Sequence, residues 1–222
     1  MKKLLALLIA ASIPAFGADY TPLVKSTVCK VVTIKVTGIG TPEPTILDIL
    51  TSNVPTERPM GFLGSGAIVS SDGVILTCNH LFRHKLKDRK VMVKLASGQT
   101  LKALILAQDD KKDLATLKIF PLHKLHYFTF GHSLKKGQAV ASFGSPLGWE
   151  QTVSFGYVEN LSISDTESLR TVHSASINPG NSGGPLVDDT GHLVGVNIES
   201  MVGMEALHLA VTLKDIHKFL GE

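Results

Sequence analysis

The stretch Asn178-Pro-Gly-Asn-Ser-Gly-Gly-Pro-Leu186 places Ser182 in a run of glycines bounded by prolines. Glycine tolerates backbone conformations that other residues avoid, so this run can form a turn tight enough to expose the serine hydroxyl. The same turn can direct backbone N–H groups toward one point, which is the arrangement that stabilises an oxyanion during acyl transfer. Ordinary polar turns share this composition. Ser182 is therefore a candidate nucleophile, and Gly180, Asn181 and Ser182 are candidate oxyanion donors, if the rest of the chain supplies a base.

A base and an acid follow from two strand-like segments. A serine hydroxyl needs a base to take its proton, and the base needs a third group that fixes its tautomer. The segment Asp72–His80 reads as a turn followed by an apolar strand that ends at His80, and Asp113 stands directly before the alternating run Leu114–Ile119. Asp109 and Asp110 compete with Asp113 for the orienting role. Both fall in the turn ahead of the strand, so Asp113 is preferred and the order is His, Asp, Ser.

These segments share a pattern with one known group of enzymes. Thr77-Cys-Asn-His80, Asp113-Leu-Ala-Thr-Leu-Lys118 and Gly180-Asn-Ser-Gly-Gly184 resemble the three active-site motifs of trypsin-like serine proteases, most closely the bacterial HtrA/Deg type. The similarity runs from about Gly61 to Leu220. The resemblance implies an acyl-enzyme on Ser182, with His80 moving the proton and Asp113 holding His80. A PDZ domain usually follows in these proteins, whereas this sequence stops at Glu222, so we expect a protease domain alone.

The fold expectation has two sources. Short β-rich runs separated by turn signals recur from Gly64 onward, which favours all-β barrels over alternating strands and helices. The resemblance implies two antiparallel β-barrels of the chymotrypsin-like kind, with the active site in the cleft between them and a short C-terminal helix. We expect the first barrel over about residues 24–120 and the second over about 127–212. Thr212 precedes apolar positions 213, 216 and 220, which predicts a capped helix over 213–220.

Two other segments carry structural predictions. Residues 40–60 contain four prolines and are expected to form a long loop. Residues 1–17 combine Lys2 and Lys3, a short apolar run and small residues before Ala18, which is typical of a secretory signal peptide. The apolar run is shorter than the roughly 20 residues that a membrane span needs. We therefore expect an exported protein, periplasmic or secreted, whose mature domain covers residues 18–222 without stable membrane insertion.

Charge, cysteines and histidines exclude several alternatives. The formal net charge of +3 falls by two with the loss of Lys2 and Lys3, and nothing in it indicates nucleic-acid binding. Cys29 and Cys78 can pair in an oxidising compartment, and the sequence leaves open whether they do. His123 and His126 lie close together without cysteine or acidic neighbours at zinc-site spacing. We expect no metal and no cofactor.

The resemblance also implies a specificity pocket. Its walls are expected from Ile177 and from the strands that carry Ile198 and Leu207, with no acid at its base, so it favours aliphatic side chains. Glu199 is a competing specificity determinant, although a solvated carboxylate at the rim is the preferred interpretation. Ser174 and His208 stand where such proteins usually carry Asp and Gly.

Polypeptides, and unfolded or misfolded chains in particular, are the expected partners. The sequence leaves a monomer and a trimer both open. Two functions of other classes also remain: a catalytically silent module that keeps the protease fold for binding, and a chaperone-like binder of unfolded proteins.

Overall fold

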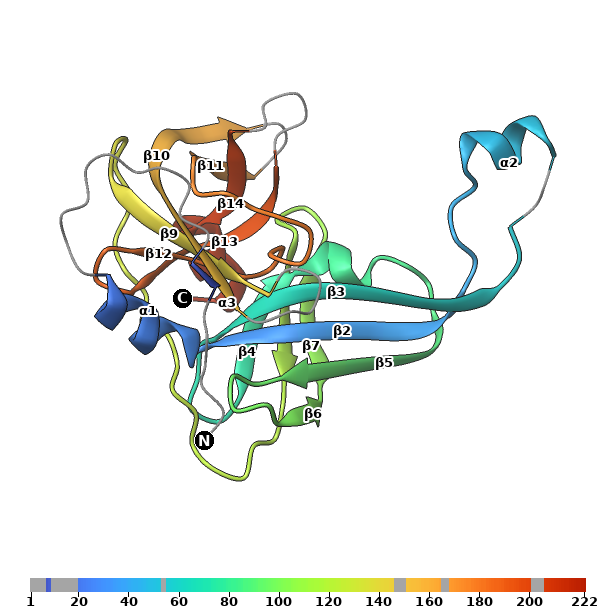
Figure 1. Ribbon diagram of the computed structural model, residues 1–222, viewed down its shortest axis with the longest axis horizontal. Helices are drawn as coiled ribbons and strands as arrows, with labels where there is room; N and C mark the ends of the chain where they lie inside the picture. The colour runs from blue at the N-terminus through green and yellow to red at the C-terminus, as the bar shows by residue number, and fades with distance from the viewer. Residues whose placement is uncertain (1–6, 9–19, 53–54, 146–150, 165–167, 201–205) are drawn as a thin grey trace.

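A computed structural model describes residues 7–8, 20–52, 55–145, 151–164, 168–200 and 206–222, which form two β-sheets and a few short helices (Figure 1). The first sheet runs in the order β6-β5-β2-β3-β4-β8-β7. Its strands are β2 (Val31–Gly40), β3 (Arg58–Ile68), β4 (Val74–Cys78), β5 (Lys87–Lys94), β6 (Thr100–Lys102), β7 (Leu104–Asp109) and β8 (Leu114–Lys118). This sheet is curled, and β6 and β7 form its two edges within the described residues.

The second sheet closes on itself. Its strands are β9 (Ala139–Gly144), β10 (Thr152–Ser164), β11 (Leu169–His173), β12 (Pro185–Asp188), β13 (Leu193–Ser200) and β14 (His208–Thr212). They follow the order β10-β11-β14-β13-β12-β9, and a further antiparallel pairing of β9 with β10 completes a six-stranded barrel. The short β1 (Leu7–Leu8) adds to β10 in parallel. The expected all-β fold is confirmed, and only the second of the two expected barrels is fully closed by hydrogen bonds.

One apolar cluster joins the two sheets. Leu76, Cys78 and Leu114 of the first sheet pack in it with Phe143, Val196 and Ile198 of the second. Each sheet also has a cluster of its own, built on Ile34, Ile75 and Leu117 in the first sheet and on Leu186, Val194 and Ala210 in the second. Burial of this apolar surface is the main term that holds the sheets together, and it fixes the line along which residues of β4 meet residues of β13.

Three helices and one 3-10 turn complete the fold of the residues that the structure describes. The C-terminal α3 (Leu213–Leu220) is present as predicted: Thr212 Oγ1 accepts a hydrogen bond from Asp215 N, and Ile216 is fully buried. The 3-10 turn η1 (Asn79–Phe82) follows β4. The helix α1 (Thr21–Val28) was not predicted, and it buries Val24 and Val28 against the shared cluster.

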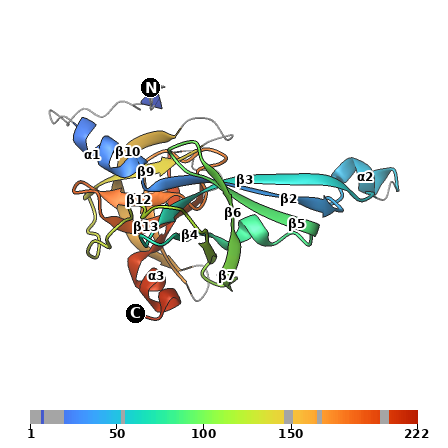
Figure 2. The ribbon, with the colours of Figure 1, turned by 90° about the horizontal axis from the view of Figure 1, so that it is seen from below.

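The predicted loop over residues 40–60 is wrong in part. Strands β2 and β3 pair along their whole length, from Val31 with Ala67 out to Gly40 with Arg58, and form a long ribbon that leaves the body of the molecule (Figures 1 and 2). The helix α2 (Ile46–Leu50) sits at its end, begun by a reciprocal pair of hydrogen bonds between Thr45 and Asp48. We call the part of this ribbon that extends beyond the last β2–β5 pair, Ile39 with Lys87, together with α2, the arm.

The structure describes little of the predicted signal peptide, but it describes both cysteines. Apart from β1, the expected signal peptide of residues 1–17 lies outside the described residues. In the described part of the chain, no helix is both long and apolar enough to cross a membrane. Cys29 and Cys78 are both free thiols, and each donates to a backbone carbonyl instead, at Ser26 and Asn197 respectively.

Candidate active site

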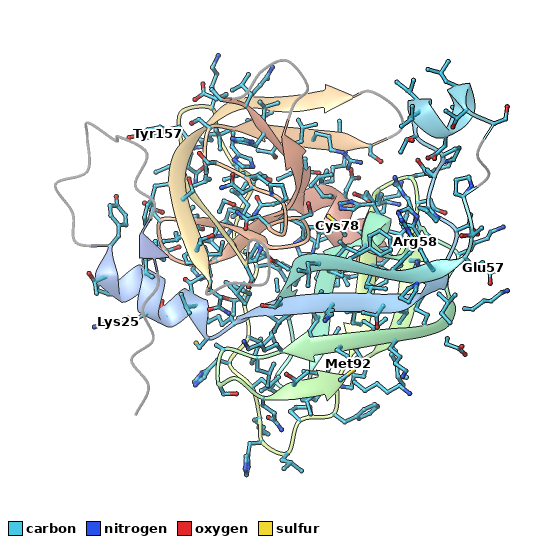
Figure 3. All side chains as sticks on the ribbon, turned by 45° about the vertical axis from the view of Figure 1, so that its right-hand side comes forward. Lys25, Glu57, Arg58, Cys78, Met92 and Tyr157 are labelled. Carbon is cyan, nitrogen blue, oxygen red and sulfur yellow. The ribbon has the colours of Figure 1, made fainter. Side chains whose placement is uncertain are left out.

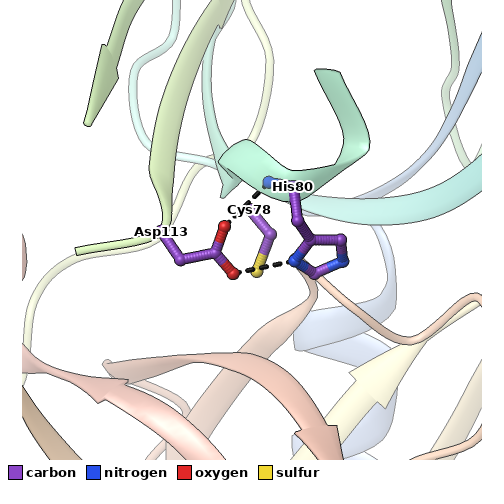
Figure 4. Close-up of side chains that lie close together, drawn as sticks. All are labelled: Cys78, His80 and Asp113. Carbon is purple, nitrogen blue, oxygen red and sulfur yellow. Dashed lines mark hydrogen bonds and ion pairs between the residues drawn. The ribbon is translucent and has the colours of Figure 1, made fainter. Parts of the chain in front are cut away.

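His80 and Asp113 form a directly bonded pair. His80 Nδ1 lies 2.7 Å from Asp113 Oδ2, and the backbone N–H of His80 donates to Asp113 Oδ1 at 2.7 Å (Figure 4). The Asp113 side chain is 7% exposed and the His80 side chain 30%, so the acid is sealed and the imidazole faces outward. An acid held in this way fixes the ring orientation and leaves Nε2 as the nitrogen available to a nucleophile.

The backbone at Asp113 is held in an uncommon conformation. Its φ is +58°, a left-handed value that non-glycine residues rarely adopt. The Asp113 carbonyl accepts the N–H of Asn79, one residue before His80, at 3.1 Å. Backbone and side chain of Asp113 therefore both bind the η1 segment, and these bonds offset the cost of the conformation, which is on the order of 1–3 kcal/mol.

The Ser182 turn docks against the strand that delivers His80. Gly180 and Gly183 have φ values of +102° and +84°, as expected of a tight glycine turn. A Cβ atom at Gly183 would lie 2.1 Å from Thr77 Oγ1, so only glycine permits this approach to the end of β4. Gly183 N also donates to Asn197 O, the carbonyl that accepts from the Cys78 thiol. The turn thus brings Ser182 into the neighbourhood of His80, although no hydrogen bond joins Ser182 Oγ to His80 among the described residues.

Two of the three expected oxyanion donors are available. Among the described residues, the backbone N–H groups of Gly180 and Ser182 make no hydrogen bond. The N–H of Asn181 instead donates to Asn178 O at 2.9 Å and closes the turn. This geometry leaves Gly180 and Ser182 as the pair of donors that can face a developing oxyanion.

Hydrogen bonds that involve Ser65 and Thr33 of the first sheet, and Ser145 just after β9, support this turn. Ser65 Oγ donates to Gly180 O at 2.6 Å and accepts from Ser145 N at 2.8 Å, and Thr33 Oγ1 donates to Ser145 Oγ at 2.7 Å. Ser65 N also donates to Ser182 O at 2.8 Å. Sequence reasoning missed this role, because Ser65 lies in an ordinary β-rich run more than 100 positions from Ser182.

Cys78, His80 and Asp113 also offer a sulfur, a nitrogen and an oxygen within 4.8 Å of one another. They do not suit a metal ion. Cys78 is fully buried, and burial together with the nearby Asp113 carboxylate raises the pKa of its thiol well above the usual range, so the thiolate that a metal requires is disfavoured. The Nδ1 atom of His80 is already bonded to Asp113.

The expected specificity residues lie on the second barrel. Ile177 is 7% exposed and Ile198 is 6% exposed, and Leu207 precedes β14, which pairs with β13. The Glu199 side chain lies outside the described residues, so its competing role stays a prediction. Ser174 Oγ accepts from Tyr157 N at 3.0 Å. His208 is buried and pairs across the sheet with His173, with ring centroids 5.9 Å apart.

The fold combines a closed barrel with a curled sheet packed against it, and the site combines a His–Asp pair with a glycine turn. These features are typical of a trypsin-like peptidase domain. The family model for that domain matches residues 64–196. The chain belongs to this family. Within it, the chain is similar to HtrA and Deg proteases: it is 35% identical to the protease Do-like 14 of Arabidopsis thaliana over 71% of its length, and 36% identical to the serine protease HTRA1 of Xenopus tropicalis over 72%. These alignments cover 40% and 35% of the two relatives.

A bacterial relative and a solved structure indicate the same kind of protease. The chain is 38% identical to a DegP-like periplasmic serine endoprotease of Pseudomonas fluorescens, over 64% of this chain and 30% of that protein. Its fold matches a substituted form of the HtrA-type protease AlgW with a decapeptide, at a TM-score of 0.81 and 26% identity, over 92% of this chain and 66% of the other. The predicted relationship to HtrA/Deg proteases is confirmed.

Proposed function

We propose that this protein is a serine endopeptidase that hydrolyses peptide bonds through an acyl-enzyme on Ser182. The observation that carries the proposal is the His80–Asp113 bond of 2.7 Å beside a glycine turn that presents Ser182. In the first step, Ser182 Oγ attacks the scissile carbonyl while His80 takes its proton, and the N–H groups of Gly180 and Ser182 stabilise the oxyanion. His80 then gives the proton to the leaving amine, and water resolves the ester by the same route.

The proposed substrates are extended polypeptides, such as unfolded or misfolded chains. The protein would meet them after export, in the periplasm or outside the cell. Two features support this choice: the signal-like pattern of residues 1–17, and relatives whose names place them in the periplasm or describe a bound decapeptide. Ile177 and Ile198 are buried and apolar, which favours an aliphatic residue before the scissile bond. Discrimination is expected to be loose, because one methylene in such a pocket changes selectivity by about 1–3 kcal/mol.

Labelling by a serine-directed fluorophosphonate tests the nucleophile directly. We expect one label per chain on Ser182, and we expect Ser182→Ala to abolish both labelling and casein hydrolysis, with a loss of turnover on the order of 10⁶. Ser133→Ala, which removes an exposed serine away from the turn, is the matched control and should behave like the wild type. A folded wild-type protein that takes no label and cleaves no peptide would instead support the silent binding module.

Export has its own test. Expression of the whole chain with and without residues 1–17 in a Gram-negative host, followed by fractionation and intact mass, should place the full-length product outside the cytoplasm with its start at Ala18. A product that keeps its N-terminus and stays cytoplasmic would contradict export while leaving the peptidase proposal intact.

A further inference from the structure

A cavity of about 580 Å³ lies at the root of the arm. Its apolar lining comes from Ile39, Met60 and Leu86, and its charged lining from Lys85, Lys87, Arg89 and Glu57. Figure 3 shows Glu57 where the arm leaves the body of the molecule. Three cations against one acid give the cavity an excess of positive charge, and its size is in the range of sites that hold a ligand. None of these residues belongs to the candidate active site.

The unpaired edge of β3 connects the active site to this cavity. In the described part of the chain, β3 pairs with β4 only at Ala67 and Ile68, whereas its other edge pairs with β2 throughout. The N–H of Ser65 points away from β2, because it donates to Ser182 O. Backbone groups alternate along a strand, so those of Leu63 and Gly61 face the same open side. An extended peptide can add to such an edge by backbone hydrogen bonds.

The proposed reaction determines which half of a substrate would lie there. His80 must protonate the leaving amine, so the chain after the scissile bond departs on the side of His80. That side is occupied by η1 and β3: Gly64 of β3 approaches Leu81, the residue next to His80, so closely that a Cβ atom would lie 2.4 Å from its side chain. The residues before the scissile bond face Ile177 and Ile198 on the other barrel.

The cavity also lies along the path that a peptide paired with β3 would follow. His84, four residues after His80, lines the cavity and stacks on Phe62 of β3 with ring centroids 4.3 Å apart. Met60 lines the cavity five residues from Ser65, which is about 17 Å of extended strand at roughly 3.4 Å per residue. A peptide paired with β3 therefore reaches the cavity about five residues after the scissile bond.

The charged groups favour an anion there. Lys85 and Lys87 are exposed, and Lys87 Nζ lies 2.6 Å from Glu57 Oε1, so only one of the three cations is matched by an acid in the lining. Arg89 Nη2 donates to His84 O at 2.6 Å, while its buried Nε has no hydrogen-bond partner among the described residues. A carboxylate can accept from such donors.

We propose that the cavity at the root of the arm binds an acidic side chain of the substrate, about five residues after the scissile bond, on a segment that pairs with the open edge of β3. This inference rests on the proposed endopeptidase function, which it extends by a second specificity site. Lys85, Lys87 and Arg89 supply the charge, and Ile39, Met60 and Leu86 contact the aliphatic part of a glutamate. The site would thus select among chains that share the same residue before the cut.

Three otherwise identical fluorogenic decapeptides, with Glu, Gln or Lys at the fifth residue after the scissile bond, test this site. For the wild type we expect kcat/KM to fall in the order Glu, Gln, Lys, by roughly threefold to tenfold in total, and the difference to shrink in high salt. The double variant Lys85→Glu with Lys87→Glu should reverse the order. The matched control, Lys90→Glu with Lys94→Glu, changes charge equally on exposed positions of β5 outside the cavity and should keep the wild-type order.

Two further measurements distinguish failure of the acidic site from failure of the peptidase function. A peptide with only two residues after the scissile bond cannot reach the cavity, so its hydrolysis tests the peptidase function alone. Fluorescence anisotropy with the Ser182→Ala protein measures binding of the labelled decapeptides without turnover. Equal binding and equal kcat/KM for the Glu and Gln peptides would overturn the acidic site even if the short peptide is cleaved. Failure to cleave any peptide would overturn the function, and the binding order would still decide the cavity's preference.

Discussion

Ser65 is a buried side chain whose hydroxyl joins the first sheet to the Ser182 turn of the second. Through Oγ and N it holds the carbonyls of both Gly180 and Ser182, the two residues whose N–H groups remain available for an oxyanion. A carbonyl lies in one peptide plane with the N–H of the next residue, so these bonds fix the planes that join Gly180 to Asn181 and Ser182 to Gly183. The N–H of Ser182 lies between the two fixed planes, which limits how far it can rotate. Ser65 is therefore a positioning residue, which acts on the substrate only through the turn.

Ser65→Ala should lower kcat by roughly tenfold to a hundredfold, somewhat less than the direct loss of an oxyanion donor, while KM changes little. The free energy of unfolding should fall by about 1–2 kcal/mol for the lost hydrogen bonds. Steady-state kinetics and urea unfolding measure the two effects. Ser70→Ala, which removes a hydroxyl that accepts from Val74 N at the β3–β4 turn, is the control for stability loss alone. A Ser65→Ala enzyme with a kcat within twofold of the wild type would contradict the positioning role.

His173 and His208 make the protein sensitive to acid. Burial and the neighbouring His208 lower the pKa of His173 to about 3, and burial also lowers the pKa of His208. An unfolded histidine titrates at about 6.5, so the unfolded chain binds more protons and stability falls as pH drops from about 6.5 toward 3. Both ring nitrogens of His173 are buried without a geometrically complete hydrogen bond among the described residues, and the nearby backbone of Ala175 raises the pKa by less than burial and His208 lower it.

Urea unfolding at pH 7.5 and 4.5 measures this linkage. Between these two values, the wild type should lose about 2–3 kcal/mol more stability than His173→Phe, which removes the titrating ring and keeps its volume. His132→Gln, at an exposed position, is the control and should follow the wild type. Equal pH dependence of the wild type and His173→Phe would show that His173 is not the titrating group.

The two short helices α2 and α3 differ in what they bury. The four apolar residues of α2, Ile46, Leu47, Ile49 and Leu50, are 65–78% exposed, whereas Ile216 of α3 is 0% exposed. Apolar side chains that stay in water contribute little to folding, and a buried isoleucine contributes several kcal/mol. The arm is thus held by its strand pairing and the Thr45–Asp48 cap, and α3 by its packing.

Replacing the four apolar residues of α2 with serine should change the free energy of unfolding by no more than about 0.5 kcal/mol. It should also leave kcat/KM for a short peptide unchanged. Ile216→Ala should cost about 2–5 kcal/mol by the same assay. Thermal and urea unfolding of both variants decide the point, and a comparable loss in the α2 variant would mean that the helix packs on something in solution.

Which elements the sequence could predict depends on how local their determinants are. The helix α3 follows from Thr212 and the spacing of three apolar residues, all within one short window. The outer part of the arm does not, because four prolines in residues 40–60 indicate a loop, whereas strand formation there depends on pairing such as Gly40 with Arg58. The helix α1 is short, and its burial of Val24 and Val28 depends on a surface built from distant strands.

The candidate site lies where the two sheets meet, a contact that we call the seam, and it is built from residues of both sheets. The motifs around His80, Asp113 and Ser182 were visible in sequence because each is a compact local pattern. The residues that support these motifs were not visible: Ser65, Ser145 and Asn197 contact the site from separate segments of the chain, and no spacing rule connects them. The same is true of the cavity at the root of the arm, whose charged residues come from two segments 28 or more positions apart.

The buried thiol of Cys78 can report how often the two sheets separate at the seam. Its thiol is fully buried, bonds to the carbonyl of Asn197 across the seam, and has a raised pKa. A thiol in this position reacts with an alkylating agent only while the two sheets are apart, so its reaction rate reports how often they separate. In the folded protein, maleimide should modify half-buried Cys29 first, and Cys78 at least a hundredfold more slowly, with peptidase activity preserved until the second event. Mass spectrometry of the maleimide-treated protein at successive times would measure how often the two sheets separate, without any substitution in the chain.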